Sequence, residues 1–142
     1  ISLSEVVTGC LSSEYPRAMF TFEMPTDESD EILTDPGLLS LIVSNALQNA
    51  ADASRPLAPE EGQVLISTGI SENSFWLAIS NRFVGAAFDL DSVAASGRTS
   101  KIGHRGLGTR VMHLAAGRLG YKVELRAVGS TANFMLRGKR YG

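Results

Sequence analysis

The sequence has little of what several protein classes require. It contains one cysteine, Cys10, so no disulfide can form within the chain, and a single thiol is typical of a reducing compartment. No apolar run approaches the ~18 residues that a membrane-spanning helix needs, and no secretory signal sequence is visible. We therefore expect a cytoplasmic domain with no direct membrane contact from this segment.

Basic residues are also few for a nucleic-acid binder. The chain has 13 Lys and Arg against 15 Asp and Glu, which gives a formal net charge of −2. Nucleic-acid binding neutralises phosphates, and domains that do so usually carry a large positive excess. We therefore expect no nucleic-acid partner. The two histidines, His104 and His113, are too few for a zinc site.

What is present indicates one ordinary globular domain. The chain has 142 residues, of which 44% are hydrophobic and 20% are charged. This balance is enough to bury a core, and the length is near that of a common single domain. The first residue is Ile1 rather than Met. We therefore expect residues 1–142 to be a single domain from the C-terminal part of a longer protein.

Hydrophobic periodicity predicts the order helix, strand, helix, hairpin, long loop, helix, hairpin. Helices are predicted at 2–11, 36–54 and 106–119, and strands at 17–24, 64–70, 75–79, 121–127 and 132–137. Hairpins imply a mixed, mostly antiparallel sheet, and strands with one apolar face imply cover on one side only. The predicted fold class is therefore α/β (α+β), a two-layer sandwich with helices on one face of the sheet.

The strongest helix prediction begins at Asp35 and Pro36. Asp35 can cap the helix, and Pro36 suits the first turn because the N–H that it lacks has no helical acceptor there. The predicted buried face of this helix comprises Leu39, Ile42, Val43, Ala46, Leu47 and Ala50. The last helix is predicted to end at Gly120 and to bury Leu107, Val111, Leu114 and Ala115.

On the helix predicted at 36–54, a polar stripe at the edge of the apolar face is formed by Asn45, Asn49 and Asp52, because residues three and four apart are neighbours on a helix. Asparagine is a poor helix former, so two of them one turn apart need a reason. A carboxamide oxygen can ligate Mg²⁺ without adding charge. The alternative is a solvated stripe with no ligand, and helix spacing alone favours that alternative.

Residues 97–109 combine glycines with cations at a predicted helix start. Glycines let the backbone approach a ligand closely, and amides at a helix N-terminus bind phosphate. Arg98, Lys101 and Arg105 lie where the helix dipole disfavours cations unless an anion is present. Phosphate binding and a flexible, solvated glycine loop are the two interpretations of this segment.

Asn81 lies where a predicted strand ends and the long loop, residues 82–105, begins. Its carboxamide can both donate and accept hydrogen bonds, which suits the edge of a nucleobase. The alternative is an ordinary turn asparagine. Taken alone, the residue favours the turn.

Together these motifs resemble those of the gyrase–chaperone–histidine kinase–MutL ATPase superfamily. Asn45 and Asn49 resemble its N box, Asn81 with Gly85 its first glycine box, and 106–108 its second. The resemblance covers about residues 18–136 and implies the Bergerat ATPase fold. Within the superfamily, the chain looks most similar to the accessory-gene-regulator type of peptide-sensing histidine kinase, through NALQNA at 45–50 and TSKIGHRGLGT at 99–109.

The resemblance also implies a role for each motif residue. Asn49 would ligate the Mg²⁺ that bridges the ATP phosphates, and Asn45 would lie near the phosphates or a metal-bound water. Asn81 would bond the adenine amino group, in place of the aspartate that most members use, and its neutral amide accepts a weaker bond. The implied catalytic residues are Asn45, Lys101 and Arg105. The implied ATP-binding set is Asn45, Asn49, Asn81, Gly85, Lys101, Arg105, Gly106, Leu107, Gly108 and Thr109.

The function that the resemblance implies is that of a sensor histidine kinase. Such a catalytic domain, the cytoplasmic part of a membrane-bound sensor, donates the γ-phosphate of Mg-ATP to a histidine on an upstream helical dimerisation domain, from which a response regulator receives it. The chain alone would then not phosphorylate itself on histidine. Three alternatives remain: a degenerate nucleotide-binding signalling module without catalysis, an anti-sigma-factor serine kinase, and an interaction domain that binds no nucleotide.

Three other conspicuous residues are assigned no catalytic role. Cys10 falls on the apolar face of the first predicted helix and is expected in the core rather than as a nucleophile. Trp76 has the opposite parity to Phe75 and Leu77, so it covers the other face of the sheet or meets a partner domain. His113 is expected to face solvent.

Overall fold

The computed structural model describes residues 1–11, 15–24, 31–54, 63–83 and 104–141. Its elements, in chain order, are α1 (Leu3–Gly9), the 3₁₀ helix η1 (Arg17–Met19), β1 (Phe20–Glu23), α2 (Pro36–Ser54), β2 (Val64–Ile70), β3 (Ser74–Arg82), α4 (His104–Leu119), β4 (Lys122–Val128) and β5 (Thr131–Lys139).

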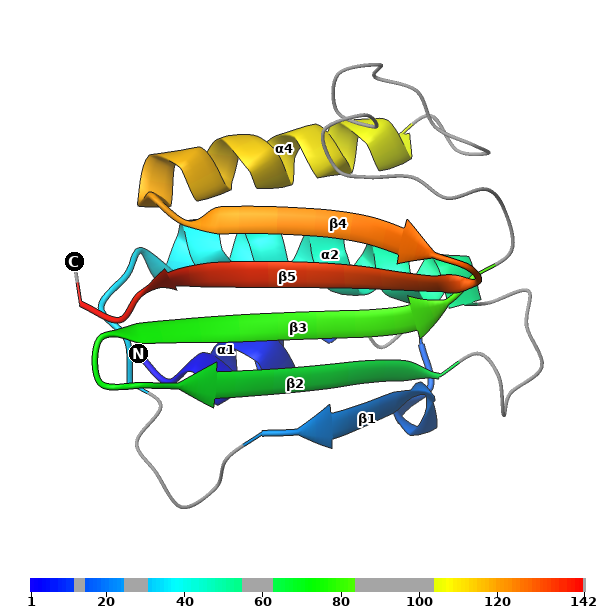
Figure 1. Ribbon diagram of the computed structural model, residues 1–142, viewed down its shortest axis with the longest axis horizontal. Coiled ribbons are helices and arrows are strands. Elements are labelled where there is room, and N and C mark those ends of the chain that lie inside the picture. The colour runs from blue at the N-terminus through cyan, green and yellow to red at the C-terminus, as the bar shows by residue number, and fades with distance from the viewer. Residues whose placement is uncertain (12–14, 25–30, 55–62, 84–103, 142) are drawn as a thin grey trace.

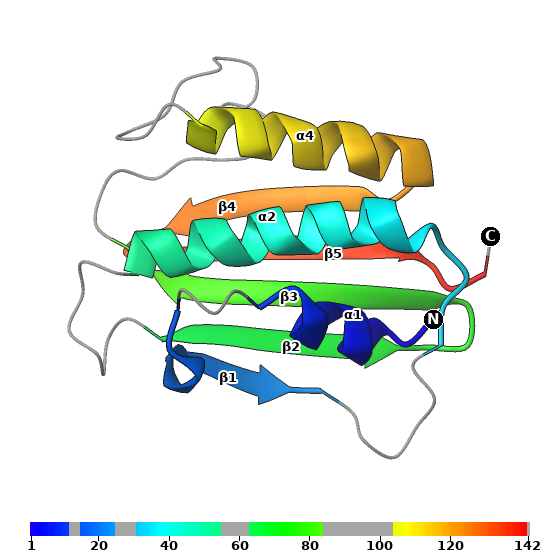
Figure 2. The same cartoon turned by 180° about the vertical axis from the view of Figure 1, so that it is seen from behind.

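These elements form two layers, with one five-stranded sheet covered on a single face by α1, α2 and α4 (Figure 1 and Figure 2). The strand order is β1-β2-β3-β5-β4. β1 runs parallel to β2, and the other neighbouring pairs are antiparallel. The predicted fold class is confirmed. Within the described parts of the chain, no helix is both long and apolar enough to cross a bilayer.

α2 begins and packs as the sequence predicts. Asp35 Oδ1 accepts hydrogen bonds from the N–H groups of Gly37, at 2.9 Å, and Leu38, at 3.1 Å, so it caps the helix. The six side chains of the predicted apolar face are at most 5% exposed. Their burial orients the helix on the sheet.

Several element boundaries differ from the prediction; for example, β3 and β5 extend to Arg82 and Lys139, beyond the predicted strand ends. Arg17–Met19 form a 3₁₀ turn rather than the start of a strand, because the Met19 N–H donates to Pro16 O at 3.0 Å. α4 begins at His104 rather than Gly106. Apolar spacing could not detect that first turn, since it holds no apolar side chain before Leu107.

The predicted buried face of α4 is wrong at Leu114, which is 64% exposed. Ala115 is buried as predicted, and Met112 and Ala116 are buried beside it; all three are at most 3% exposed. α4 packs chiefly against α2 rather than against the sheet, and small side chains allow two helices to approach closely. His113 is exposed, as predicted. Gly120, at a φ of +74°, ends the helix as predicted.

Two glycines make room for aromatic rings on opposite faces of the sheet. Trp76 pairs with Gly69 across the β2–β3 ladder and covers the face without helices, where a Cβ on Gly69 would lie 2.2 Å from the indole Nε1. On the covered face, a Cβ on Gly138 would lie 2.4 Å from Tyr121 Cδ1 and 2.9 Å from Phe75 Cε1. The Phe75 and Tyr121 rings meet edge to face, with centroids 5.1 Å apart.

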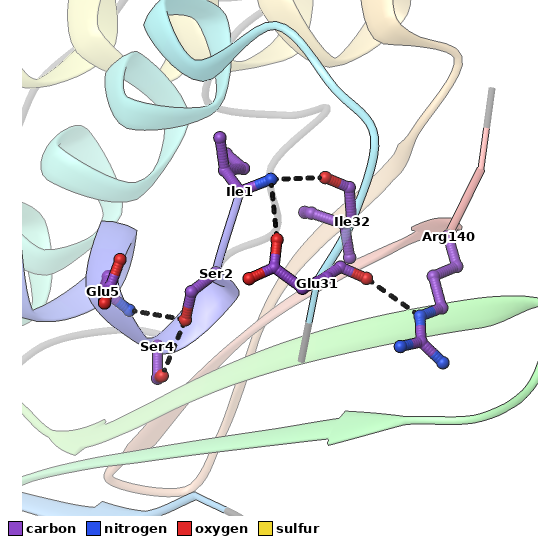
Figure 3. Close-up of polar contacts among 7 residues, drawn as sticks. All are labelled: Ile1, Ser2, Ser4, Glu5, Glu31, Ile32 and Arg140. Carbon is purple, nitrogen blue, oxygen red and sulfur yellow. Dashed lines mark hydrogen bonds and ion pairs between the residues drawn. The ribbon is translucent and has the colours of Figure 1, made fainter. Parts of the chain in front are cut away.

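The segment that leads into α2 holds both ends of the chain (Figure 3). The Ile1 amino group donates to Ile32 O at 2.9 Å and lies 3.2 Å from Glu31 Oε2. From the other end, Arg140 Nε donates to Glu31 O at 2.8 Å, and its Nη1 to Ser71 O at 3.3 Å. Both ends therefore lie beside the β2–β3 hairpin, away from the end of β3 (Figure 1).

Gly138→Ala should destabilise the domain by about 1–3 kcal/mol, because the added methyl group overlaps two packed rings. Gly117→Ala is the matched control: it lies on α4 with nothing within 4 Å of an added Cβ, so it should be neutral or stabilise by about 0.5–1 kcal/mol. Urea unfolding measures both free energies. Equal stability of the two variants would contradict this packing.

Candidate functional site

The three elements that carry predicted site residues, α2, β3 and α4, share one end of the sandwich. α2 ends, β3 ends and α4 begins at that end, opposite the β2–β3 hairpin (Figure 1). α2 lies between α1 and α4 over the sheet (Figure 2). The second half of α2, the last residues of β3 and the first turn of α4 therefore lie toward the same end of the molecule.

Asn45 and Asn49 are half-buried side chains one turn apart on α2. Nδ2 of Asn45 donates to Leu41 O at 2.8 Å, so the carboxamide oxygen is the acceptor that this side chain can offer a ligand. Both residues lie at the edge of the apolar face, as predicted. Their partial burial argues against a fully solvated stripe.

Asp52, the third residue of the stripe, is held by Tyr15. The Tyr15 hydroxyl donates a hydrogen bond to Asp52 Oδ1, and Tyr15 is 6% exposed. Tyr15 precedes β1 and lies 37 positions away in sequence, so helix spacing could not reveal it. Asp52 therefore has a structural partner, Tyr15, which the sequence pattern did not reveal.

A pocket of about 200 Å³ lies on the α1 side of α2. The α2 residues that line it are Ser44, Leu47 and Gln48, so it faces another side of the helix than Asn45 and Asn49. Its remaining lining residues are Cys10, Leu11, Tyr15 and Phe20.

Cys10 follows α1 as its C-cap and is half-buried. Its thiol donates to Ser40 O, with an Sγ–O distance of 3.7 Å. Burial raises the pKa of the Cys10 thiol above its usual value, and the hydrogen bond with Ser40 opposes that rise only in part. Since the thiolate is the nucleophile, this environment agrees with the predicted structural role.

Asn81 is the residue before the last in β3, and its backbone pairs with Val64 on one side and Ala132 on the other. It is 6% exposed on the face that the helices cover. Nδ2 donates to Arg82 O at 3.0 Å. The turn interpretation is therefore wrong: Asn81 is a buried strand residue whose amide is oriented by a backbone carbonyl.

Ser54 was not singled out by the sequence, although it continues the buried face of α2, four positions after Ala50. It is 1% exposed. Its hydroxyl lies 2.9 Å from Ala50 O and 3.3 Å from Arg82 O and donates to both. Ser54 therefore connects the end of α2 to the end of β3, next to Asn81.

The predicted phosphate-binding residues 105–109 lie in the first two turns of α4. Only the first-turn N–H groups of a helix lack an intrahelical acceptor, and these can bind an anion. Gly106 lies in that first turn, whereas Gly108 and Thr109 lie in the second. Gly85 and Lys101, predicted to lie beneath the base and beside the phosphates, are outside the described residues.

The donor chemistry fits a magnesium ion that arrives with a phosphate ligand. Among the described residues, no group of three His, Cys, Asp or Glu side chains could hold a metal ion. Mg²⁺ is commonly bound by one or two protein oxygens, with phosphates and waters completing the octahedron. A carboxamide oxygen, such as that of Asn49, is a ligand of the oxygen type that such an ion takes.

Residues 36–136, from the start of α2 into β5, match the model of the GHKL domain family. The chain belongs to this family. The match includes each of the described site residues. No curated protein sequence matches the chain.

Solved structures share the fold of this GHKL domain over nearly its whole length. The nucleotide-free catalytic domain of histidine kinase ThkA has a TM-score of 0.75 and 15% identity, covering 99% of this chain and 94% of that one. Mycobacterial sensor histidine kinase MprB has a TM-score of 0.72 and 19% identity, and the match covers 98% of this chain and 95% of that one. Full-length ShkA in complex with AMPPNP has a TM-score of 0.67 and 16% identity, and the match covers 97% of this chain and 30% of that one.

Cys10 should react with iodoacetamide more slowly in the folded domain than in the chain unfolded by urea. The raised pKa lowers the thiolate fraction near neutral pH, so the rate should climb as the pH increases toward that pKa. Alkylation kinetics followed by mass spectrometry measure this. Equal rates in the folded and unfolded chain would contradict the environment described.

Proposed function

We propose that this GHKL domain is the ATP-binding catalytic domain of a sensor histidine kinase. It would bind Mg-ATP and donate the γ-phosphate to a histidine on a separate helical dimerisation domain, from which a response regulator receives it. The observation that carries the proposal is Asn81, a buried carboxamide on the covered face of the sheet, at the end of the molecule where α2 ends and α4 begins. The full-length likeness to ThkA and MprB supports it.

The nucleotide would lie between the end of β3 and the facing parts of α2 and α4. Asn81 Oδ1 would accept a hydrogen bond from the adenine amino group. Asn49 would hold Mg²⁺, which when bound neutralises charge on the phosphates. First-turn amides of α4, with Gly106 among them, would contact the phosphates. Phosphoryl transfer needs mainly positioning and charge neutralisation, and these groups would supply both.

The remaining proposed roles extend this arrangement. Asn45, one turn before Asn49, would lie near the phosphates or a metal-bound water. Arg105 and Lys101 would bring positive charge to the β- and γ-phosphates. We also propose the accessory-gene-regulator type, on the motif at 45–50 and on the neutral Asn81, and with it a cytoplasmic location beneath a membrane-bound sensor. The domain boundary at residues 1–142 belongs to the same proposal.

Asn81→Ala should weaken ATP binding about 5–150-fold, because it removes the hydrogen bond to the base, worth about 1–3 kcal/mol at a buried site. Asn133→Ala is the matched control, since Asn133 lies on the opposite face of the sheet, where it accepts from Ser80 Oγ at 2.7 Å. Isothermal titration calorimetry measures both affinities. Unchanged ATP affinity in folded Asn81→Ala would disprove the assignment.

Asn49→Ala should lower the affinity for Mg-ATP by about tenfold or more, while the affinity for ATP in EDTA stays the same. The reason is that the proposed Asn49 oxygen acts only through the metal. Gln48→Ala removes the neighbouring carboxamide, which faces the pocket on the α1 side, and should change neither affinity. Equal losses with and without Mg²⁺ would count against the metal role.

Incubated alone with radiolabelled ATP, this chain should acquire no acid-labile phosphate. His113 is exposed on α4, well beyond its first turn, and His104, in that turn, is poorly placed for in-line attack on a phosphate held there. Adding a helical phosphoacceptor domain should give labelling of that domain. Phosphohistidine on the chain itself would contradict the proposal.

The same assay separates the alternatives. Acid-stable phosphate on a partner protein would indicate a serine kinase, and ATP binding with no transfer to any acceptor would indicate a degenerate signalling module. No nucleotide binding at all would indicate an interaction domain.

A further inference from the structure

One backbone carbonyl at the end of β3 accepts hydrogen bonds from two buried side chains. Ser54 Oγ, at the end of α2, lies 3.3 Å from Arg82 O, and Asn81 Nδ2 lies 3.0 Å from the same oxygen. Ser54 is 1% exposed and Asn81 is 6% exposed. The Arg82 carbonyl thereby connects α2, through Ser54, with the Asn81 side chain that we propose binds the adenine base.

The bond to Arg82 O decides which end of the Asn81 amide a ligand meets. A carbonyl oxygen only accepts, so it binds the amide nitrogen, and Oδ1 lies on the other side of the planar group. An asparagine free to flip could accept from the amino group of adenine or donate to O6 of guanine, because these bases carry opposite groups at that position. Held in this orientation, Asn81 presents an acceptor, as an aspartate would.

We propose that Ser54 is a positioning residue for nucleobase selection: its hydroxyl holds the Arg82 carbonyl, and this carbonyl keeps Asn81 Oδ1 toward the base, so that adenine is preferred over guanine. The inference rests on the proposed binding of ATP at Asn81. The preference for adenine would then depend on Ser54, a residue of α2 that need not touch the nucleotide.

Ser44, on the same helix, is a serine whose hydroxyl hydrogen bond stays within α2. Its hydroxyl donates to Leu41 O at 3.3 Å within the helix, and the residue is only half-buried. Ser54 makes the same kind of bond to Ala50 O, at 2.9 Å, and shares its proton with a carbonyl of the sheet. That second acceptor distinguishes the two residues, so Ser44→Ala is the matched control.

The test is the ratio of Mg-GTP to Mg-ATP dissociation constants, measured by calorimetry on the 142-residue chain. Thr and Val have nearly the same shape, so comparing Ser54→Thr with Ser54→Val isolates the hydroxyl. Wild type and Ser54→Thr should prefer ATP, and Ser54→Val should lose about 3–10-fold of that preference, the effect of one hydrogen bond. Ser44→Ala should keep the wild-type ratio.

Repeating the test in an Asn81→Asp variant distinguishes a role of Ser54 in nucleobase preference from a general role in stabilising the fold. In Asn81→Asp both terminal atoms are acceptors and neither can bond the Arg82 carbonyl, so this carbonyl no longer selects which atom faces the base. Adding Ser54→Val to Asn81→Asp should leave the ratio unchanged, whereas a merely structural role would give the same change in both backgrounds. Thermal unfolding verifies that each variant folds, and Ser54→Ala replaces Ser54→Val if the latter does not.

Each result decides the matter. An unchanged ratio in folded Ser54→Val, with ATP still bound, overturns the role of Ser54 alone. Equal wild-type affinity for ATP and GTP overturns the orientation argument while leaving nucleotide binding intact. No binding of ATP by the wild-type chain overturns the proposed function and this inference with it.

Discussion

The burial of one face of α2 against the sheet is the constraint on which the site depends. Its buried residues recur at helical spacing from Leu39 to Ser54, and burying a Leu, Ile or Val side chain is worth about 1.5–3 kcal/mol. Rotating the helix would expose several of them at once. The apolar face therefore sets the orientation of the polar edge, where Asn45 and Asn49 are half-buried. The bond from Ser54 to Arg82 O then connects the end of the helix to the end of β3.

The burial of Asn81 follows from the alternation of side chains along β3. Inward residues alternate along β3, from Phe75 through Leu77 and Ile79 to Asn81, so the last of them is a polar group among apolar neighbours. A buried amide without a partner is costly, and Arg82 O supplies one. The hydrogen bond that lowers this cost also orients the amide, so packing and the proposed recognition of the base depend on the same contact. Ile1 and Arg140 contact the segment at Glu31 and Ile32 at the opposite end of the sheet.

Local patterns predicted most of the fold. The cap at Asp35, the apolar face of α2 and the alternation in β2 and β3 are encoded within a few residues of each other, and the structure confirms them. What failed depends on distant contacts. Leu114 is exposed because α4 turns its small residues inward, which no spacing rule states. The bonds from Tyr15 to Asp52 and from Ser54 to Arg82 join residues 37 and 28 positions apart. Of the predicted site, Asn45, Asn49 and Asn81 have described surroundings, whereas Gly85 and Lys101 lie outside the described residues.

In the proposed complex, nucleotide binds between the end of β3 and the polar edge of α2. Nuclear magnetic resonance of side-chain amides labelled with ¹⁵N tests it most directly, because asparagine and glutamine NH₂ groups report on their own surroundings. Titration with a non-hydrolysable Mg-ATP analogue should shift the Asn81 and Asn49 signals strongly and leave Asn133 and Gln48 where they are. Shifts confined to Gln48, beside the pocket between α1 and α2, or to Asn133, on the uncovered face, would contradict the account.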